Sequence, residues 1–409
     1  MTDATYSVPA DVAARRNPAL IAGIVGLAAC AAGFALDRED FFRAYLIAYL
    51  FWLGIALGSM ALMMVHHMSG GAWGLVIRRI FEASSRTLPA LAILFLPLLL
   101  GMQELYPWTH ADHVAHDTAL QHKAAYLNTP FFLARTVFYF ACWIVLAWLL
   151  NRWSLEQDRD HVESATRKMQ MLSGAGLVVY GLTITFASVD WVMSINPHWF
   201  STIYGFLFMG GQALAALAFT VVVAAILSRR RPMEGVYNVG HFHDLGKLML
   251  AFVMLWAYFN FSQYLIIYSG NLAEEVPYYL ARTTAGWQYL ALLLVAFHFA
   301  LPFALLLSRD LKRSANRLLT VALGVLLMRL VDLFFLITPD FAPDGTNLHL
   351  ATGGEAHGTQ LFAHWLDLAA PIGIGGIWLW LFLTQLAKRP LLPIRDPHLA
   401  QALESAGGH

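Results

Sequence analysis

Ten long apolar runs constrain the fold of this chain more than any other feature of its sequence. They are separated by short polar connections and cover residues 19–36, 43–67, 87–105, 131–150, 171–193, 201–228, 246–268, 285–308, 317–337 and 362–387. A helix needs about 20 apolar residues to cross a bilayer. The sequence therefore predicts an all-α, polytopic transmembrane helix bundle of about ten spans. The first run ends in small residues, as a signal peptide does, but its long polar leader favours a retained span.

The charges of the connections predict an orientation. Of the 26 Lys and Arg residues, one lies deep inside a run (Arg329), and one side of the bilayer holds only Arg38, Arg43, Lys123, Arg135 and Arg282, in its connections or near the ends of the adjoining runs. The other side, which includes the two terminal segments, holds the remaining Lys and Arg residues. Arg78, Arg79 and Arg86 are among them. An excess of Lys and Arg marks the cytoplasmic face. Both termini are therefore predicted to be cytoplasmic, and the long connections 106–130, 269–284 and 338–361 to face outward.

The composition excludes a soluble protein. The sequence has 58% hydrophobic residues and 13% charged residues, whereas about a quarter of the residues of a soluble domain are charged. The net charge of zero gives no reason to expect nucleic acid as a partner, and the lipid bilayer is the expected surroundings. We divide the chain into a cytoplasmic segment (1–18), a transmembrane domain (19–387) and a cytoplasmic tail (388–409).

A group of polar side chains lies deep inside the runs. An intramembrane charge costs about 2.5–3.5 kcal/mol on insertion scales, so such residues usually mark ion pathways, proton relays or ligand sites. The depth of each residue in the membrane follows from its position in its run, at about 1.5 Å per residue. His298 and Arg329 lie near the midplane. The others lie in the outer half of the membrane: Asp332, His364, Asp367, Asp190, Asn260, Gln263 and Glu104. We predict that they form a polar funnel that is open to the outside and closes near His298.

The predicted funnel suits two functions. Its residues could instead have purely structural roles. Carboxylate, imidazole and amide groups in series can relay protons. The same groups can bind a quinone headgroup whose tail lies among apolar side chains. Alternatively, Arg329 and Asp332 neutralise each other, His364 and Asp367 form a solvated rim, and His298 is a hydrogen-bonded core histidine. The functional hypothesis depends on the whole group rather than on any one residue.

No redox centre or metal site is expected on the chain itself. Its two cysteines, Cys30 and Cys142, lie in separate runs, and no haem-attachment or iron–sulfur motif is present. His67, His298 and His364 lie at different depths, which excludes a pair of axial haem ligands. Four histidines in the connection 106–130 lack zinc-site spacing, so this connection is expected to be solvated or to contact a partner.

Three segments resemble a known family of membrane proteins. They are residues 66–89, DWVMSINPHWFSTIYG from Asp190 to Gly205, and LWAYFNFSQYLIIYSGNLAEE from Leu255 to Glu275. All three are similar to one of the two integral membrane subunits of bacterial alternative complex III that belong to the polysulfide-reductase or NrfD-like family. The resemblance covers essentially all ten spans. It implies an NrfD-like bundle in the inner (cytoplasmic) membrane of a bacterium.

The resemblance also implies partners and a function. Alternative complex III is a quinol:cytochrome c oxidoreductase of the respiratory electron-transport chain, and its haem c and iron–sulfur centres lie on other subunits at the outer side. The sister NrfD-like protein of the complex has the better-supported quinol site. We therefore expect this chain to act within a multi-subunit complex, not as an enzyme alone. It would supply a proton pathway, a pocket for menaquinone or ubiquinone, or both.

Two other functions compete with this interpretation. One is a stand-alone, proton-coupled secondary transporter with Arg329 and Asp332 as the coupling pair. Transporters usually contain paired interrupted helices around a site at the midplane, and the sequence shows no convincing pair. The other is a purely structural membrane subunit in which the buried charges serve helix packing.

Overall fold

The structure is a computed structural model that describes residues 6–159, 162–352 and 359–404. In this part of the chain, ten helical segments are long and apolar enough to cross a membrane: Ala10–Leu36, Arg38–Ser69, Ala72–Leu100, Thr129–Arg159, Glu163–Ile195, Tyr204–Leu227, Val239–Gly270, Trp287–Leu307, Ala315–Asp340 and Leu366–Leu386. Each contains the greater part of one predicted run. The prediction of an all-α bundle with ten candidate spans is therefore confirmed.

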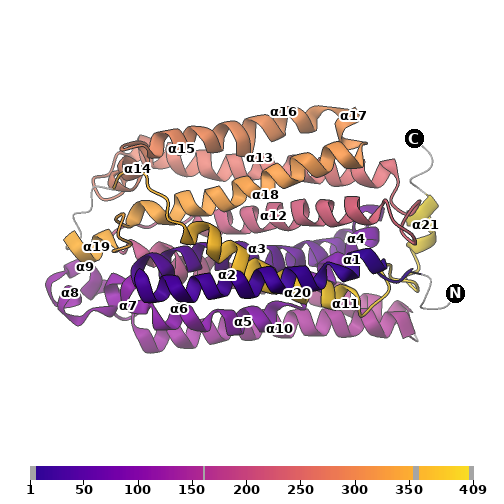
Figure 1. Cartoon of the computed structure of the whole chain (residues 1–409), viewed down its shortest axis with the longest axis horizontal. Coiled ribbons are helices and arrows are strands. Elements are labelled where there is room, and N and C mark those ends of the chain that lie inside the picture. Colours follow the sequence, from indigo (N-terminus) through magenta and orange to yellow (C-terminus); the bar gives the residue numbers. More distant parts are fainter. Residues whose placement is uncertain (1–5, 160–161, 353–358, 405–409) are drawn as a thin grey trace.

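Eight long helices make up most of the bundle. They are α2 (Arg16–Leu36), α3 (Arg38–Ser69), α10 (Thr129–Arg159), α11 (Val162–Trp191), α12 (Tyr204–Leu227), α13 (Val239–Gly270), α18 (Ala315–Ile337) and α20 (Leu366–Leu386). Helices α3 and α12 pack against each other at the centre, between α13 and α10 in Figure 1. Both are almost wholly buried, because the other helices surround them.

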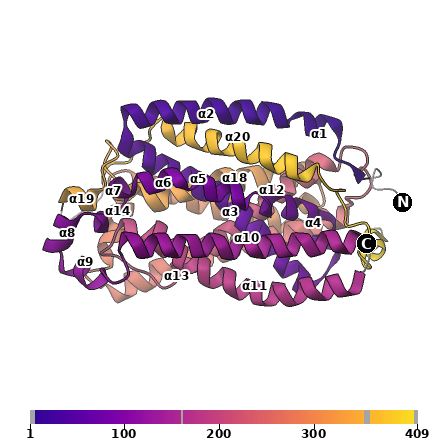
Figure 2. The ribbon, with the colours of Figure 1, turned by 90° about the horizontal axis from the view of Figure 1, so that it is seen from below.

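Helix α2 packs closely along α20 at the edge of the bundle, as Figure 2 shows. A Cβ atom on Gly26 would lie 2.5 Å from the Cα of Gly373, and one on Gly376 would overlap the backbone of Gly23. Such positions are far inside van der Waals contact, so the missing side chains allow the two backbones to touch. Small residues are used in this way between membrane helices.

Two spans are interrupted. The third is divided into α4 (Ala72–Ser85), α5 (Leu88–Leu94) and α6 (Leu96–Leu100), and α7 (Met102–Leu105) follows it. The eighth consists of α15 (Trp287–Leu294), a π-helical segment (Val295–Ala300) and α16 (Leu301–Leu307). Pro97 and Pro302 lie in the first turns of α6 and α16, where the missing N–H does not break a helical hydrogen bond. The sequence shows no convincing pair of interrupted spans, whereas the structure divides these two spans into shorter helical pieces.

The helix α4 also corrects the predicted connection between the second and third spans. Arg78 and Arg79 were counted there as charges of a solvated connection, but both lie in α4 and are 2% exposed. They are buried because they are ion-paired with Glu82 in the same helix. Charge bias alone does not distinguish such residues from charges on a surface.

The bundle has two distinct ends. One end carries α8 (Ala111–His116), α9 (Thr118–Lys123), α14 (Val276–Thr283) and α19 (Leu348–Thr352), and we call it the α8 end. The opposite end carries α1 (Ala10–Ala14), α17 (Arg309–Lys312) and α21 (Leu399–Glu404), and we call it the α21 end. The first and last described helices thus share one end. Residues 1–5 and 405–409 of the predicted terminal segments and 353–358 of the connection 338–361 lie outside the described residues.

Candidate functional site

The predicted site residues separate into several clusters. Arg329, Asp332, His298, Asn260 and Gln263 gather near one cavity in the half of the bundle towards the α8 end. The other four predicted residues, Asp190, Asp367, His364 and Glu104, belong to ion pairs elsewhere. The structure therefore divides the single funnel expected from depth alone into one cavity and separate ion pairs.

Asp332 connects the charged and aromatic members of the first cluster. Arg329 donates a hydrogen bond from Nη1 to Asp332 Oδ2 one turn further along α18. Trp256, from α13, donates its indole N–H to the same oxygen at 3.0 Å. A Cβ atom on Gly211 would overlap the guanidinium of Arg329. Glycine at this position in α12 therefore makes room for the arginine.

His298 lies beside this group. It belongs to the π-helical segment of the eighth span, an irregularity that is frequent at functional sites. Its ring meets that of Trp256 edge-on, with centroids 4.4 Å apart. The side chain is fully buried, and within the described part of the chain neither ring nitrogen has a hydrogen-bond partner. The alternative of a hydrogen-bonded core histidine is therefore not supported.

A cavity of about 690 Å³, which we call the membrane cavity, lies between α13, α14, α15 and α18. Its wall is mainly aliphatic and aromatic. The polar side chains in the wall include Asn260, Gln263, Tyr279, Arg282 and Asp332. Three predicted residues thus line one cavity. Arg329 and His298 are not part of its wall: Arg329 contacts Asp332, and His298 contacts Trp256. This combination of apolar walls and few polar groups is typical of small-molecule sites.

Hydrogen bonds fix the polar groups of the membrane cavity. Gln263 donates to the hydroxyl of Tyr279 at 3.1 Å and accepts from Ser201 at 2.9 Å. Asn260 donates to the backbone carbonyl of Trp256 at 2.9 Å. Burial raises the pKa of Tyr279 to about 12, so its hydroxyl remains a donor at neutral pH. The cavity therefore offers fixed donors and acceptors to a bound molecule.

The membrane cavity borders the outer surface of the bundle. Tyr258 and Phe261 belong to its wall and are 63% and 62% exposed. Both lie on α13, within a candidate membrane span. An apolar molecule in the bilayer can therefore approach the cavity from the side.

Asp190 is held in a different cluster. Arg135 donates two hydrogen bonds to its carboxylate, of 2.8 and 2.9 Å, and Tyr139 donates a third of 2.8 Å. The carboxylate is fully buried, and the Arg135 guanidinium lies over the ring of Tyr126. A bidentate pair of this kind is strong and fixed in geometry. The arrangement favours a structural role that connects α10 to α11.

The predicted residues of the tenth span also belong to ion pairs. Asp367 accepts a hydrogen bond of 3.1 Å from Arg43, which also contacts Asp40 at 2.8 Å. The imidazole of His364 lies 3.7 Å from Asp37, whose side chain is 49% exposed. Asp367 thus faces a buried arginine, whereas His364 lies at a solvated rim, which was one of the alternatives considered for it.

Glu104, the remaining predicted residue, pairs with Arg38 at 2.7 Å. The Arg38 side chain is 54% exposed. Such exposed pairs contribute little to stability, and the contact lies apart from the membrane cavity. The structure therefore does not bring Glu104 to the first cluster.

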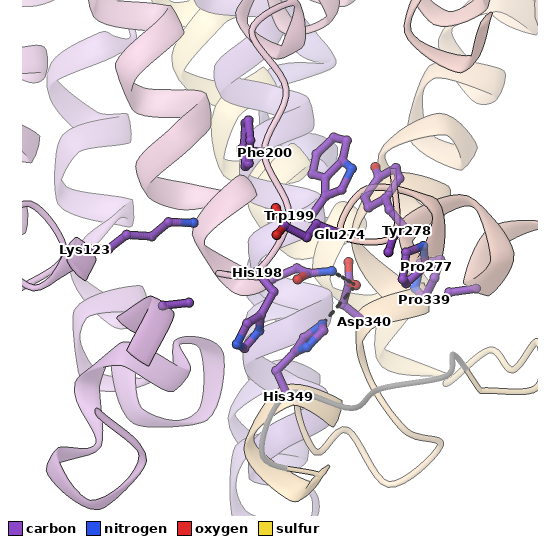
Figure 3. A pocket seen from close by; sticks show the side chains of 14 residues that line it. Lys123, His198, Trp199, Phe200, Glu274, Pro277, Tyr278, Pro339, Asp340 and His349 are labelled. Carbon is purple, nitrogen blue, oxygen red and sulfur yellow. Dashed lines mark hydrogen bonds and ion pairs between the residues drawn. The ribbon is translucent and has the colours of Figure 1, made fainter. Parts of the chain in front are cut away.

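A second cavity, the outer cavity, lies at the α8 end and has a volume of about 470 Å³ (Figure 3). Its wall includes His198, Trp199, Tyr278, Asp340 and His349. Trp199 and Tyr278 stack with their centroids 3.7 Å apart. Tyr278 also lines the membrane cavity, so the two cavities share a wall.

An ion pair stands beside this shared wall. Arg282 lines the membrane cavity and donates a hydrogen bond of 2.6 Å to Asp340, which lines the outer cavity. Burial opposes the charge of Arg282, but the Asp340 carboxylate raises its pKa above the ordinary value. His349 contacts the other oxygen of Asp340 at 3.4 Å. None of these three residues was predicted, because their runs and connections give no sign that they meet.

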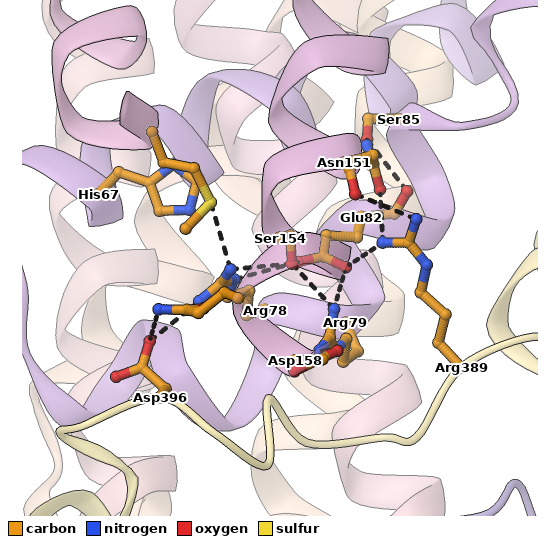
Figure 4. Close-up of polar contacts among 12 residues, drawn as sticks. His67, Arg78, Arg79, Glu82, Ser85, Asn151, Ser154, Asp158, Arg389 and Asp396 are labelled. Atoms are coloured by element: carbon orange, nitrogen blue, oxygen red, sulfur yellow. Dashed lines mark hydrogen bonds and ion pairs between the residues drawn. The ribbon is translucent and has the colours of Figure 1, made fainter. Parts of the chain in front are cut away.

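The α21 end contains a charge network that the sequence also did not predict (Figure 4). Glu82 is fully buried and lies within 3.0 Å of three arginines, Arg78, Arg79 and Arg389. Ser154 donates to the same carboxylate at 2.5 Å. Arg389 follows α20 and also contacts α10. The network thus fastens the chain after α20 to the bundle.

Comparisons with known proteins assign no family to the chain. No protein-family model matches it, and no curated protein matches it either. Among the described residues, no group of three or more His, Cys, Asp or Glu side chains is arranged to hold a metal ion. The functional argument therefore depends on the geometry of the cavities.

Proposed function

We propose that this chain is an integral membrane subunit of a respiratory quinol:electron-acceptor oxidoreductase of the alternative complex III type, and that its membrane cavity binds the quinol headgroup. The observation that carries the proposal is the arrangement of Asp332, Gln263 and Asn260 around one largely apolar cavity. Its volume of about 690 Å³ lies within the range of about 300–1,000 Å³ common for ligand sites. A quinol combines two hydroxyl groups with an apolar tail and suits such walls.

The polar groups of the cavity match the chemistry of a quinol. The Asp332 carboxylate can accept a hydrogen bond from one hydroxyl, and the amide oxygens of Gln263 and Asn260 are acceptors for the other. Arg329 and Trp256 fix the carboxylate, so it is held in place before a ligand arrives. The exposed rings of Tyr258 and Phe261 lie where the tail would pass into the bilayer.

Oxidation of a quinol needs partners for the electrons. Each quinol gives up two electrons and two protons to form the quinone. In the proposed complex, haem c or an iron–sulfur cluster on a partner protein accepts the electrons, and the protons leave through this chain. The sister NrfD-like protein would then hold a further quinol site. The chain itself supplies binding, orientation and proton acceptors.

The proposed location is the inner membrane of a bacterium, with the α21 end in the cytoplasm. The excess of Lys and Arg at the α21 end supports this orientation. The long connections of the α8 end would then face the periplasm, on the side where haem c subunits are expected. An NrfD-like fold is part of the same proposal.

Purification through a tag on this chain tests the proposal. We expect haem c and iron–sulfur subunits to co-purify, a haem spectrum, and quinol oxidation by the complex. Tyr279→Phe removes a hydroxyl of the membrane cavity, and we expect it to raise the KM for quinol about tenfold, the effect of one hydrogen bond of about 1.4 kcal/mol. Tyr268→Phe is the control, because Tyr268 is exposed on the same side but does not line the cavity.

A stand-alone transporter remains the second candidate, because the third and eighth spans are interrupted. Interrupted helices often surround transporter sites, and His298 lies in one of them. A colourless and stable preparation of this chain alone, without quinol oxidation, would favour this candidate over the oxidoreductase. A complex that oxidises quinol with an unchanged KM in the Tyr279→Phe variant would instead leave a structural role for this chain.

A further inference from the structure

Three cavities follow one another from the membrane cavity to the surface of the α8 end. The membrane and outer cavities share Tyr278. A third cavity of about 310 Å³, the surface cavity, shares His198 and His349 with the outer cavity. Its wall also includes Asp112, from α8, and Asp117, at the start of α9. The shared walls bring the membrane cavity within a few side chains of solvent.

A chain of polar groups follows the same course, in which Arg282 stays charged and the groups that can titrate begin at Asp340. Arg282 of the membrane cavity contacts Asp340 at 2.6 Å, and Asp340 contacts His349 at 3.4 Å. The rings of His349 and His198 have centroids 6.1 Å apart. His198 in turn lies 2.6 Å from Asp117 through its Nε2 atom. These residues come from α14, the end of the ninth span, α19, the connection after α11, and the start of α9.

Buried polar atoms without partners lie along this course. Within the described residues, His349 Nδ1 and Trp199 Nε1 have no hydrogen-bond partner, although these side chains are only 6% and 3% exposed. His198 Nδ1 is also without a partner there. An unpaired buried polar group is costly, so these atoms are expected to bind polar molecules such as water inside the outer cavity. Figure 3 shows His198, His349 and Asp340 gathered at this cavity.

We propose that Asp340, His349, His198 and Asp117 form a proton exit from the membrane cavity to the outer surface, with water in the outer cavity completing the path. This inference rests on the proposed function, because the protons come from the quinol. Each oxidation releases two protons from the quinol hydroxyls, while the two electrons pass to the haem or iron–sulfur acceptor of the partner protein. The protons pass through the exit one at a time and enter the solvent beyond Asp117. No group of the chain is consumed.

The chemistry of the four groups suits such an exit. Imidazole can bind a proton on one nitrogen and release one from the other, and it changes charge near neutral pH. Asp340 and Asp117 stand on either side of the two histidines, so each imidazolium would have a carboxylate beside it. Other charged or titratable side chains lie in the walls of the outer and surface cavities: Lys123, Glu274, Asp112, His113 and His116.

The test uses the whole complex purified through this chain. The variant His349→Ala removes the buried histidine and leaves a space beside the outer cavity. The rate of proton release during quinol oxidation is followed with a pH indicator, with and without added imidazole. We expect the rates of proton release and of quinol turnover to fall at least about tenfold. The loss should be smaller than the about 100-fold loss that follows removal of a direct general base, because water can carry some of the protons. Imidazole should restore the rate, and pyrazole, which is a far weaker base, should not.

His122→Ala is the matched control. His122 lies on α9 near the same end but is exposed and outside the walls of these cavities. This variant should release protons at the wild-type rate. If His349→Ala prevents assembly, His198→Ala takes its place, because His198 is less buried and its loss disturbs packing less.

The outcomes separate the exit from the proposed function. A wild-type complex that does not oxidise quinol would contradict the proposed function. An active wild-type complex in which His349→Ala and His198→Ala behave like His122→Ala would overturn the exit alone. A slow variant that imidazole does not restore would also overturn it, because the loss would then be structural. Restoration by imidazole is the expected result.

Discussion

Trp256 and Asp332 are joined by a hydrogen bond of 3.0 Å from the indole nitrogen to a carboxylate oxygen. The bond connects α13 to α18 and holds the carboxylate at the wall of the membrane cavity. On its other side, Trp256 contacts the buried ring of His298. Trp256 therefore lies between His298, which the sequence places near the midplane, and the Asp332 carboxylate, which lines the membrane cavity.

The first prediction concerns the pair of Arg329 and Asp332. Asp332→Leu leaves a buried guanidinium without its partner, which typically costs about 3–5 kcal/mol. Replacement of both residues, in the variant Arg329→Met/Asp332→Leu, should recover most of that loss because no unpaired charge remains. Thermal unfolding of the purified complex measures both. Quinol oxidation should be lost in the double variant as well, and a double variant with wild-type turnover would show that Asp332 does not contact quinol.

The second prediction separates Asp190 from the membrane cavity. Asp190→Asn weakens the bidentate contact with Arg135, so the complex should become less stable by about 3–5 kcal/mol. Turnover per assembled complex should stay at the wild-type value. Asp244→Asn is the control for stability, because Asp244 forms an exposed pair with Lys247. A turnover that falls while the assembled complex keeps its melting temperature would instead assign Asp190 to a proton path.

The third prediction concerns the network around Glu82. Glu82→Gln leaves three arginines around a neutral group, so the chain after α20 should detach from α4 and α10. Limited digestion with trypsin, followed by mass spectrometry, should then show faster cleavage after Lys388 and Arg395. Glu156→Gln removes an exposed partner of Lys168 and should leave the digestion unchanged. Equal cleavage in the two variants would contradict the anchoring role of the network.

The fourth prediction is a pH dependence at the start of α9. Asp117 accepts hydrogen bonds from the backbone N–H groups of Ala119 and Leu120 at 2.8 and 3.2 Å. Burial raises the pKa of Asp117, but these N–H groups and His198 outweigh it and bring the pKa below the ordinary 3.8. The stabilisation is therefore complete above that value and is lost as the pH falls through the lower pKa of the folded state.

Hydrogen exchange of the Ala119 and Leu120 amides measures this effect. Asp117→Ala should weaken the protection of α9 by about 1 kcal/mol near neutral pH, as the loss of a helix cap does. The difference between wild type and variant should shrink as the pH is lowered below about 3.8 and through the lower pKa of the folded state, where the carboxylate becomes protonated. A difference that stays constant over this range would exclude the carboxylate as its source.

The ten spans could be predicted because bilayer length and apolarity are properties of single runs. The polar groups of the membrane cavity were partly predictable for the same reason. Asp332, Asn260 and Gln263 stand out against apolar neighbours at a similar depth. Depth does not say which helices are adjacent, however, so Asp190 and Asp367 could not be separated from Asp332 by sequence alone.

Other features depend on contacts between distant parts of the chain. Arg282 and Asp340 lie in polar connections or at their edges, where charged residues are ordinary, and their pairing appears only when α14 meets the end of the ninth span. Arg78 and Arg79 look like charges of a solvated connection, because the packing of α10 against α4, which covers them, appears only in three dimensions. The π-helical segment of the eighth span cannot be recognised from the hydropathy of the sequence.

Labelling with a light-activated quinone analogue tests the central claim most directly. The complex purified through this chain is illuminated with the analogue, and the labelled peptides are identified by mass spectrometry with and without an excess of the natural quinone. The account predicts that residues 254–264 of α13 and 278–283 of α14 are labelled, and that the excess quinone suppresses this label. Label confined to another protein of the complex, or label on this chain that the quinone does not suppress, would contradict a quinol site in the membrane cavity.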